Sequence, residues 1–89
     1  MTAVNLDHLP TANPAARGLY AKGYAAACES LRTLAETGVS LEDLRTIART
    51  NVIPVHDYGR SDYDHGASEA WARFLTRTRP GQRFRSWDV

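Results

Sequence analysis

Side chains of the types that bind metals or transfer protons are concentrated in the stretch HDYGRSDYDH. It contains His56, Asp57, Asp62, Asp64 and His65. All of these are common metal ligands, but the stretch has neither two histidines four positions apart nor an accompanying Cys-x-x-Cys pair. Aspartate and glycine are also usual in turns and at helix starts. We therefore interpret the stretch as a turn that leads into a helix, and we predict no metal site and no cofactor.

Arginine and aromatic side chains are concentrated at the end of the chain. Five arginines and one aspartate give residues 70–89 a net charge of +4, whereas residues 1–69 have a net charge of −3. Such a segment can anchor a protein partner, because arginine and tryptophan are frequent at interface centres. It can also bind phosphates and stack on bases, as nucleic-acid-binding proteins do. The predicted partner-binding residues are Arg73, Arg77, Arg79, Arg83, Phe84, Arg85 and Trp87.

The same residues also allow a purely structural interpretation. Arg73 and Arg77 come late in a predicted helix, where the helix dipole favours positive charge. Glu69 and Arg73 are four positions apart, the spacing of a favourable ion pair on a helix. Phe84 and Trp87 can fold back to cover apolar surface. This interpretation stays open beside protein binding and nucleic-acid binding.

Cys28 is the single cysteine, so an intrachain disulfide is impossible and a reducing compartment fits the sequence. It lies between Ala27 and Leu31 on an apolar stripe, where a thiol acts as a small hydrophobic group. The chain contains no glycine-rich phosphate loop and no Gly-x-Ser-x-Gly motif. We therefore predict no catalytic residues. No apolar run approaches the roughly 20 residues that span a bilayer, so we expect a cytoplasmic protein without membrane contact.

The sequence predicts an all-α fold in which three helices position these residues. The first helix is expected over 14–37, after Asn13 and before Gly38; the second follows the N-cap Ser40 and closes at Asn51; the third follows Ser61 or Asp62 and ends before Pro80. Val52–Val55 is predicted to be an extended connector. The expected organisation is a flexible lead-in (1–12), a helical domain (13–79) and a C-terminal tail (80–89).

One spacing occurs twice, 43 residues apart. The repeated positions are Tyr20, Gly23 and Ala27 in the first helix and Tyr63, Gly66 and Ala70 in the third. Glycine inside a helix costs about 1 kcal/mol relative to alanine, so two such glycines indicate a need for space. Residues three and four apart share one face of a helix. We therefore predict that the first and third helices cross closely at Gly23 and Gly66.

The expected length of the first helix has a further consequence. About 24 helical residues extend about 36 Å, whereas a compact domain of this size is about 30 Å across. The helix is then expected to project beyond the core, bend at a glycine, or pack against a second copy. A projecting end would expose Leu19, Tyr20 and Tyr24, so self-association through this helix is predicted.

The junction between the first two helices resembles a helix-turn-helix. Residues Gly38, Ser40, Leu41, Glu42 and Arg45 match a phrase of MerR-type regulators that belongs to a structural helix. In a DNA-binding helix-turn-helix, the start of the second helix would contact the bases. Here that position carries Glu42 and Asp43, which repel phosphate. We therefore interpret this segment as an ordinary end and start of two helices.

In length, in its arginine- and alanine-rich composition and in its lack of a catalytic motif, the chain resembles the small accessory proteins of actinobacterial phages. This resemblance implies a host protein as the partner and transfers no individual residues. The predicted function is a small protein-binding adaptor or inhibitor that acts by surface contact. The alternative is a nucleic-acid-binding protein that uses the arginine-rich end.

Overall fold

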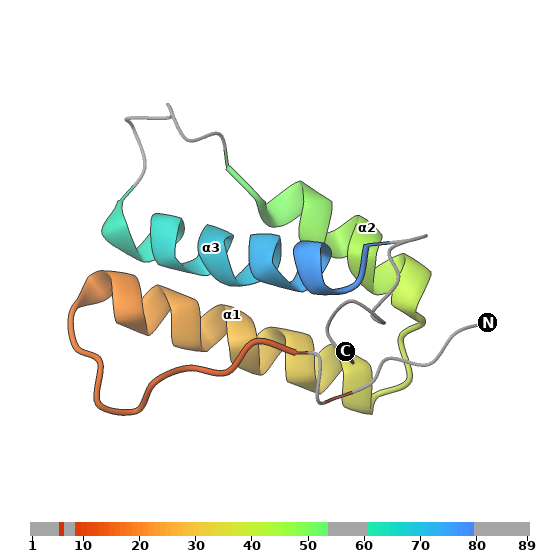
Figure 1. Ribbon diagram of the computed structural model, residues 1–89, viewed down its shortest axis with the longest axis horizontal. Coiled ribbons are helices and arrows are strands. Elements are labelled where there is room, and N and C mark those ends of the chain that lie inside the picture. Colours follow the sequence, from red (N-terminus) through yellow and green to blue (C-terminus); the bar gives the residue numbers. More distant parts are fainter. Residues whose placement is uncertain (1–5, 7–8, 54–60, 80–89) are drawn as a thin grey trace, which may run out of the picture.

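The computed structural model describes residues 6, 9–53 and 61–79, and these form three helices. They are α1 (Leu19–Glu36), α2 (Leu41–Asn51) and α3 (Asp62–Arg77). Helices α1 and α3 lie side by side and run in the same direction, whereas α2 runs the opposite way and packs mainly on α3 (Figure 1). Within these residues there is no strand. The predicted all-α fold of three helices is confirmed.

The predicted start of α1 is wrong, because the helix begins at Leu19 instead of residue 14. Asn13 does accept a hydrogen bond from the backbone N–H of Ala15 (2.9 Å), but this closes only a short turn. Gly18 then has φ 99° and ψ 172°, and these backbone angles lie outside the helical range. The helix therefore has 18 residues, or about 27 Å, within a molecule of 35 × 31 × 27 Å. No projecting overhang exists, and the length argument for self-association fails.

The other helix ends follow the local sequence signals. Gly38 has φ 93°. Its N–H donates to the carbonyl of Ala35, and the N–H of Val39 donates to the carbonyl of Leu34. This is the hydrogen-bond pattern of a Schellman motif. The side chain of Ser40 then accepts from Asp43 N–H (3.2 Å) at the start of α2. These contacts confirm the predicted stop and start between α1 and α2.

Helix α3 is fixed at its beginning by a cap and in its middle by the chain that precedes it. The side chain of Ser61 accepts from Asp64 N–H (3.2 Å), so Ser61 is the N-cap. Buried Ser68 accepts from Ile53 N–H (2.9 Å), which ties the extended residues after α2 to α3. Of the predicted connector Val52–Val55, only the first two residues are described.

Helices α1 and α3 come into backbone contact at Gly23 and Gly66. A methyl group built on Gly23 would overlap the carbonyl oxygen of Tyr63, with the carbonyl carbon at 2.7 Å. A methyl group on Gly66 would overlap the carbonyl oxygen of Tyr20 in the same way, with its carbon at 2.8 Å. The structure therefore places the repeated spacing where it was predicted to act, at the crossing of the first and third helices.

The two contacts at this crossing mirror each other. Each glycine faces the carbonyl of the residue three positions before the other glycine, and the helices are parallel (Figure 1). The two halves of the repeat are thus related by a local two-fold axis along the helix pair. A backbone approach this close allows weak Cα–H···O bonds from the glycines to the facing carbonyl oxygens.

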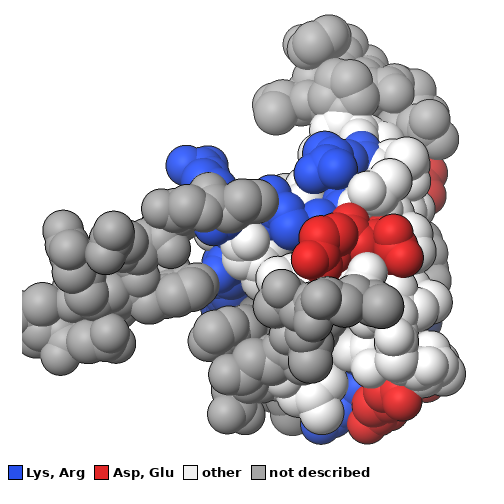
Figure 2. All heavy atoms as spheres, turned by 90° about the vertical axis from the view of Figure 1, so that its right-hand side faces the viewer, with Lys and Arg blue, Asp and Glu red and all other residues white. Residues whose placement is uncertain are grey.

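The C-terminal end of α3 is closed by a side chain from α2. Arg45 donates from Nη1 to the carbonyl of Leu75 and to the hydroxyl of Thr78, both at 2.7 Å. A cation at this position also suits the negative end of the helix dipole. Figure 2 looks onto the end of the bundle where α2 begins, and arginine side chains gather there beside acidic ones.

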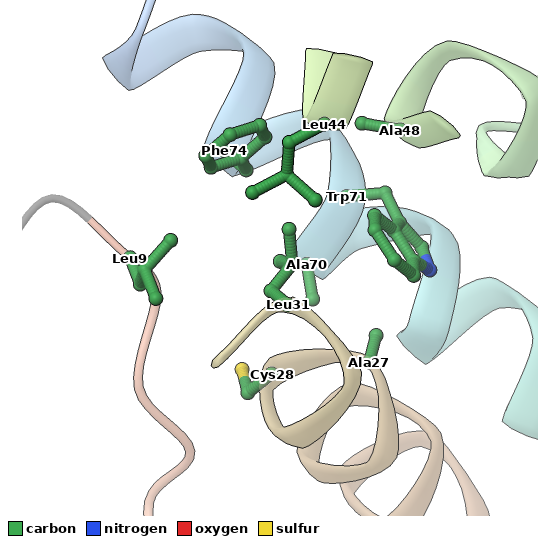
Figure 3. Close-up of a cluster of buried hydrophobic side chains, with 9 residues drawn as sticks. All are labelled: Leu9, Ala27, Cys28, Leu31, Leu44, Ala48, Ala70, Trp71 and Phe74. Carbon is green, nitrogen blue, oxygen red and sulfur yellow. The ribbon is translucent and has the colours of Figure 1, made fainter. Parts of the chain in front are cut away.

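The core lies between the three helices and is completed by one residue that precedes them. Its fully buried side chains are Leu31 of α1, Leu44 of α2 and Phe74 of α3. Leu9 is 5% exposed and reaches this cluster from the segment before α1, which runs back along that helix (Figures 1 and 3). The remaining members are Ala27, Cys28, Ala48, Ala70 and Trp71.

Among the described residues, none of the helices has the length and apolar character required to cross a membrane. The predicted C-terminal tail, 80–89, lies outside the described residues.

Candidate partner-binding surface

Arg73 of α3 makes two contacts within the helix pair. Its Nε lies 3.4 Å from a carboxylate oxygen of Glu69, the pair predicted from the spacing. Its guanidinium carbon lies 5.6 Å from the ring centroid of Tyr24 on α1, within the range of a cation–π contact. The side chain is still 55% exposed. Arg73 therefore has an internal structural role and keeps an accessible charged face.

Arg77 and Arg79 differ from each other in their surroundings. Arg77 is half-buried and donates from Nη1 to the backbone carbonyl of Leu9 (3.3 Å), which fastens the N-terminal segment to α3. Arg79 follows the helix and is exposed. Arg73 and Arg77 thus lie in the C-terminal half of α3, and Arg79 lies just beyond its end. The other predicted binding residues lie outside the described part of the chain, namely Arg83, Phe84, Arg85 and Trp87.

The role of Arg45 was not predicted from the sequence. The sequence shows it only as one more arginine on a helix, whereas its hydrogen bonds join positions 30 and 33 residues apart. Burial lowers the pKa of Arg45, and the charges of Arg49 and Arg79 lower it further. Its Nε is buried and has no hydrogen-bond partner among the described residues. A local sequence pattern carries no signal for such a contact.

Cys28 lines a cavity of about 320 Å³ between the N-terminal segment and α1. The cavity wall is formed by Leu6, Leu9, Pro10, Thr11, Ala12, Cys28, Glu29 and Arg32. Cys28 is 9% exposed, and Figure 3 shows its side chain among the buried cluster. Burial raises its pKa, while Arg77 and Arg73 offset part of that effect. A raised pKa keeps the thiol protonated and weakens it as a nucleophile.

Cys28 is expected to react with a thiol-specific disulfide reagent at least about tenfold more slowly than free cysteine at pH 8. The raised pKa reduces the thiolate fraction, and burial hinders access. The rate should also begin to rise at a higher pH than it does for free cysteine. Stopped-flow absorbance measures this, with the protein in denaturant as the control that restores full reactivity. A native rate equal to that of free cysteine would contradict the buried placement.

The stretch that resembles a set of metal ligands is only partly described. His56 and Asp57 lie outside the described residues. Asp62, Asp64 and His65 belong to the first turn of α3, where acidic side chains favour helix formation. Across residues 6, 9–53 and 61–79, no three potential ligands are grouped closely enough to hold a metal ion.

These features define a small all-α protein in which two parallel helices cross at glycines and a third helix closes the end of one of them. Comparison of the chain with protein-family models, with curated proteins and with solved structures found no match.

Proposed function

We propose that the protein is a small protein-binding module, an adaptor or inhibitor, that acts by surface contact without catalysis. The observation that carries the proposal is the arginine row of Arg73, Arg77 and Arg79, which leads along α3 to the end of the bundle. The first two are oriented by internal contacts. Arginines already held in place lose little side-chain freedom on binding, which favours a protein partner.

The sequence that follows α3 supports the same proposal. Arg83, Phe84, Arg85 and Trp87 come within ten residues of Arg77, so the charged row and two large aromatics belong to one short part of the chain. Aromatic and arginine side chains together dominate the energy of many interfaces. The chain's likeness in size and composition to small accessory proteins of actinobacterial phages is consistent with a cytoplasmic host protein as the partner.

The test is capture from a lysate of an actinobacterial host on the immobilised full chain at physiological salt, read out by mass spectrometry. One protein should be retained specifically, and Arg79→Ala combined with Trp87→Ala should reduce its recovery about tenfold or more. Arg17→Ala combined with Lys22→Ala, which changes exposed charges at the start of α1, serves as the control. The proposal fails if no protein is retained, or if duplex DNA binds with a steep salt dependence and proteins do not.

A further inference from the structure

Two arginines of α2 and one that follows the end of α3 lie at the junction of these two helices. Arg45 bonds to Thr78 at the end of α3, and Arg79 is the next residue along the chain. Arg49 lies one turn further along α2 than Arg45, so the two share a helix face. Arg49 and Arg79 are exposed. We call these three residues the junction cluster.

Among the described residues, no residue of the junction cluster forms an ion pair. The ion pairs formed among these residues join Arg32 to Glu36 and Arg73 to Glu69, and neither involves the cluster. Like charges one turn apart on a helix destabilise it by a few tenths of a kcal/mol. An anion placed between the two helices would relieve the repulsion.

The charges around the cluster select the type of anion. Glu42 and Asp43 lie in the first turn of α2, close to the cluster along the chain. A long polyanion such as a nucleic-acid strand needs a continuous track of cations and would meet these carboxylates. A short acidic peptide needs only a few cations, and the planar guanidinium matches a carboxylate with two parallel hydrogen bonds.

We infer that the junction cluster of Arg45, Arg49 and Arg79 is a binding site for the paired carboxylates of an acidic peptide segment in the partner protein. Arg45 is held in place by its bonds to α3, whereas Arg49 and Arg79 are exposed and supply the accessible charge. This inference rests on the proposed function and extends its surface from α3 onto α2.

The test measures fluorescence anisotropy of a labelled decapeptide with six glutamates, added to the full chain at 50 mM salt. A single-stranded oligonucleotide with the same net charge is the comparison. The peptide should bind more tightly than the oligonucleotide, and Arg49→Glu combined with Arg79→Glu should weaken peptide binding about tenfold or more. The control is Arg17→Glu combined with Lys22→Glu, which changes the net charge by the same amount at the start of α1. It should change the affinity for the peptide less than about threefold.

The thermal midpoint of both double variants should stay within a few degrees of that of the parent, because all four side chains are exposed. Equal losses in the two variants, tighter binding of the oligonucleotide, or no peptide binding would overturn the inference. Repeating the lysate capture with Arg49→Glu alone separates the two proposals, because Arg49 belongs only to the junction cluster whereas Arg79 belongs to both surfaces. A partner that is still retained would refute the junction cluster alone, whereas the absence of any partner with the parent protein would refute the proposed function.

Discussion

Replacing Gly23 or Gly66 with alanine is expected to lower the free energy of unfolding by about 2–3 kcal/mol. The new methyl group would overlap a backbone carbonyl of the other helix, that of Tyr63 or of Tyr20. A backbone cannot rotate away as a flexible side chain can, so α1 and α3 must separate along their length. In an ordinary exposed helix the same substitution stabilises by about 1 kcal/mol. The sign of the effect is therefore diagnostic of the crossing.

Chemical denaturation with circular dichroism measures this change, and the thermal midpoint should fall by roughly 10–20 °C for a domain of this length. Ser30→Ala, on the exposed side of α1, is the control and should leave stability within about 0.5 kcal/mol. Because the two contacts mirror each other, Gly23→Ala and Gly66→Ala should have similar effects. If both variants were as stable as the parent, the backbone contact would not exist in solution.

The features that could be predicted from the sequence depend on neighbouring residues. Ser40 and Ser61 act as caps because their side chains reach an N–H three positions along the chain. Gly38 ends α1 because it adopts a positive φ that other residues avoid. The crossing at Gly23 and Gly66 was predictable for a related reason, since unfavourable residues in a helix interior indicate a packing requirement.

The start of α1 could not be predicted from such local rules. Asn13 and Pro14 are good residues for beginning a helix, yet the helix starts five residues after Pro14. Leu9 is buried against the core, and Arg77 holds its carbonyl from 68 residues away. To bring Leu9 there, the chain must run back along α1 and turn before the helix begins. A tertiary contact thus overrides the local preference.

The candidate site shows the same division. The pair of Glu69 and Arg73 was predictable because it is local to one helix. The bonds from Arg45 to the end of α3 were not, because they need the relative placement of two helices. The junction cluster therefore emerges only from the folded chain, although each of its arginines is visible in the sequence.

Replacing Phe74 with alanine is expected to cost about 3–5 kcal/mol of unfolding free energy. Phe74 is fully buried in the cluster that also contains Leu31 of α1 and Leu44 of α2, so its loss weakens the core that the three helices share (Figure 3). A chain of 89 residues has a total stability of about 5–13 kcal/mol. The variant should therefore be close to unfolding, with the loss of much of its helical circular dichroism on mild heating.

Phe74→Leu separates lost packing from a general failure to fold, because leucine fills most of the same space and should cost only about 1–2 kcal/mol. Leu19→Ala removes a side chain that is 57% exposed and should have little effect. Urea unfolding curves of the three variants should rank Leu19→Ala, Phe74→Leu and Phe74→Ala in order of increasing loss. If Phe74→Ala were no less stable than Leu19→Ala, Phe74 would not lie at the centre of the core, and α2 would have to pack on α3 in another way.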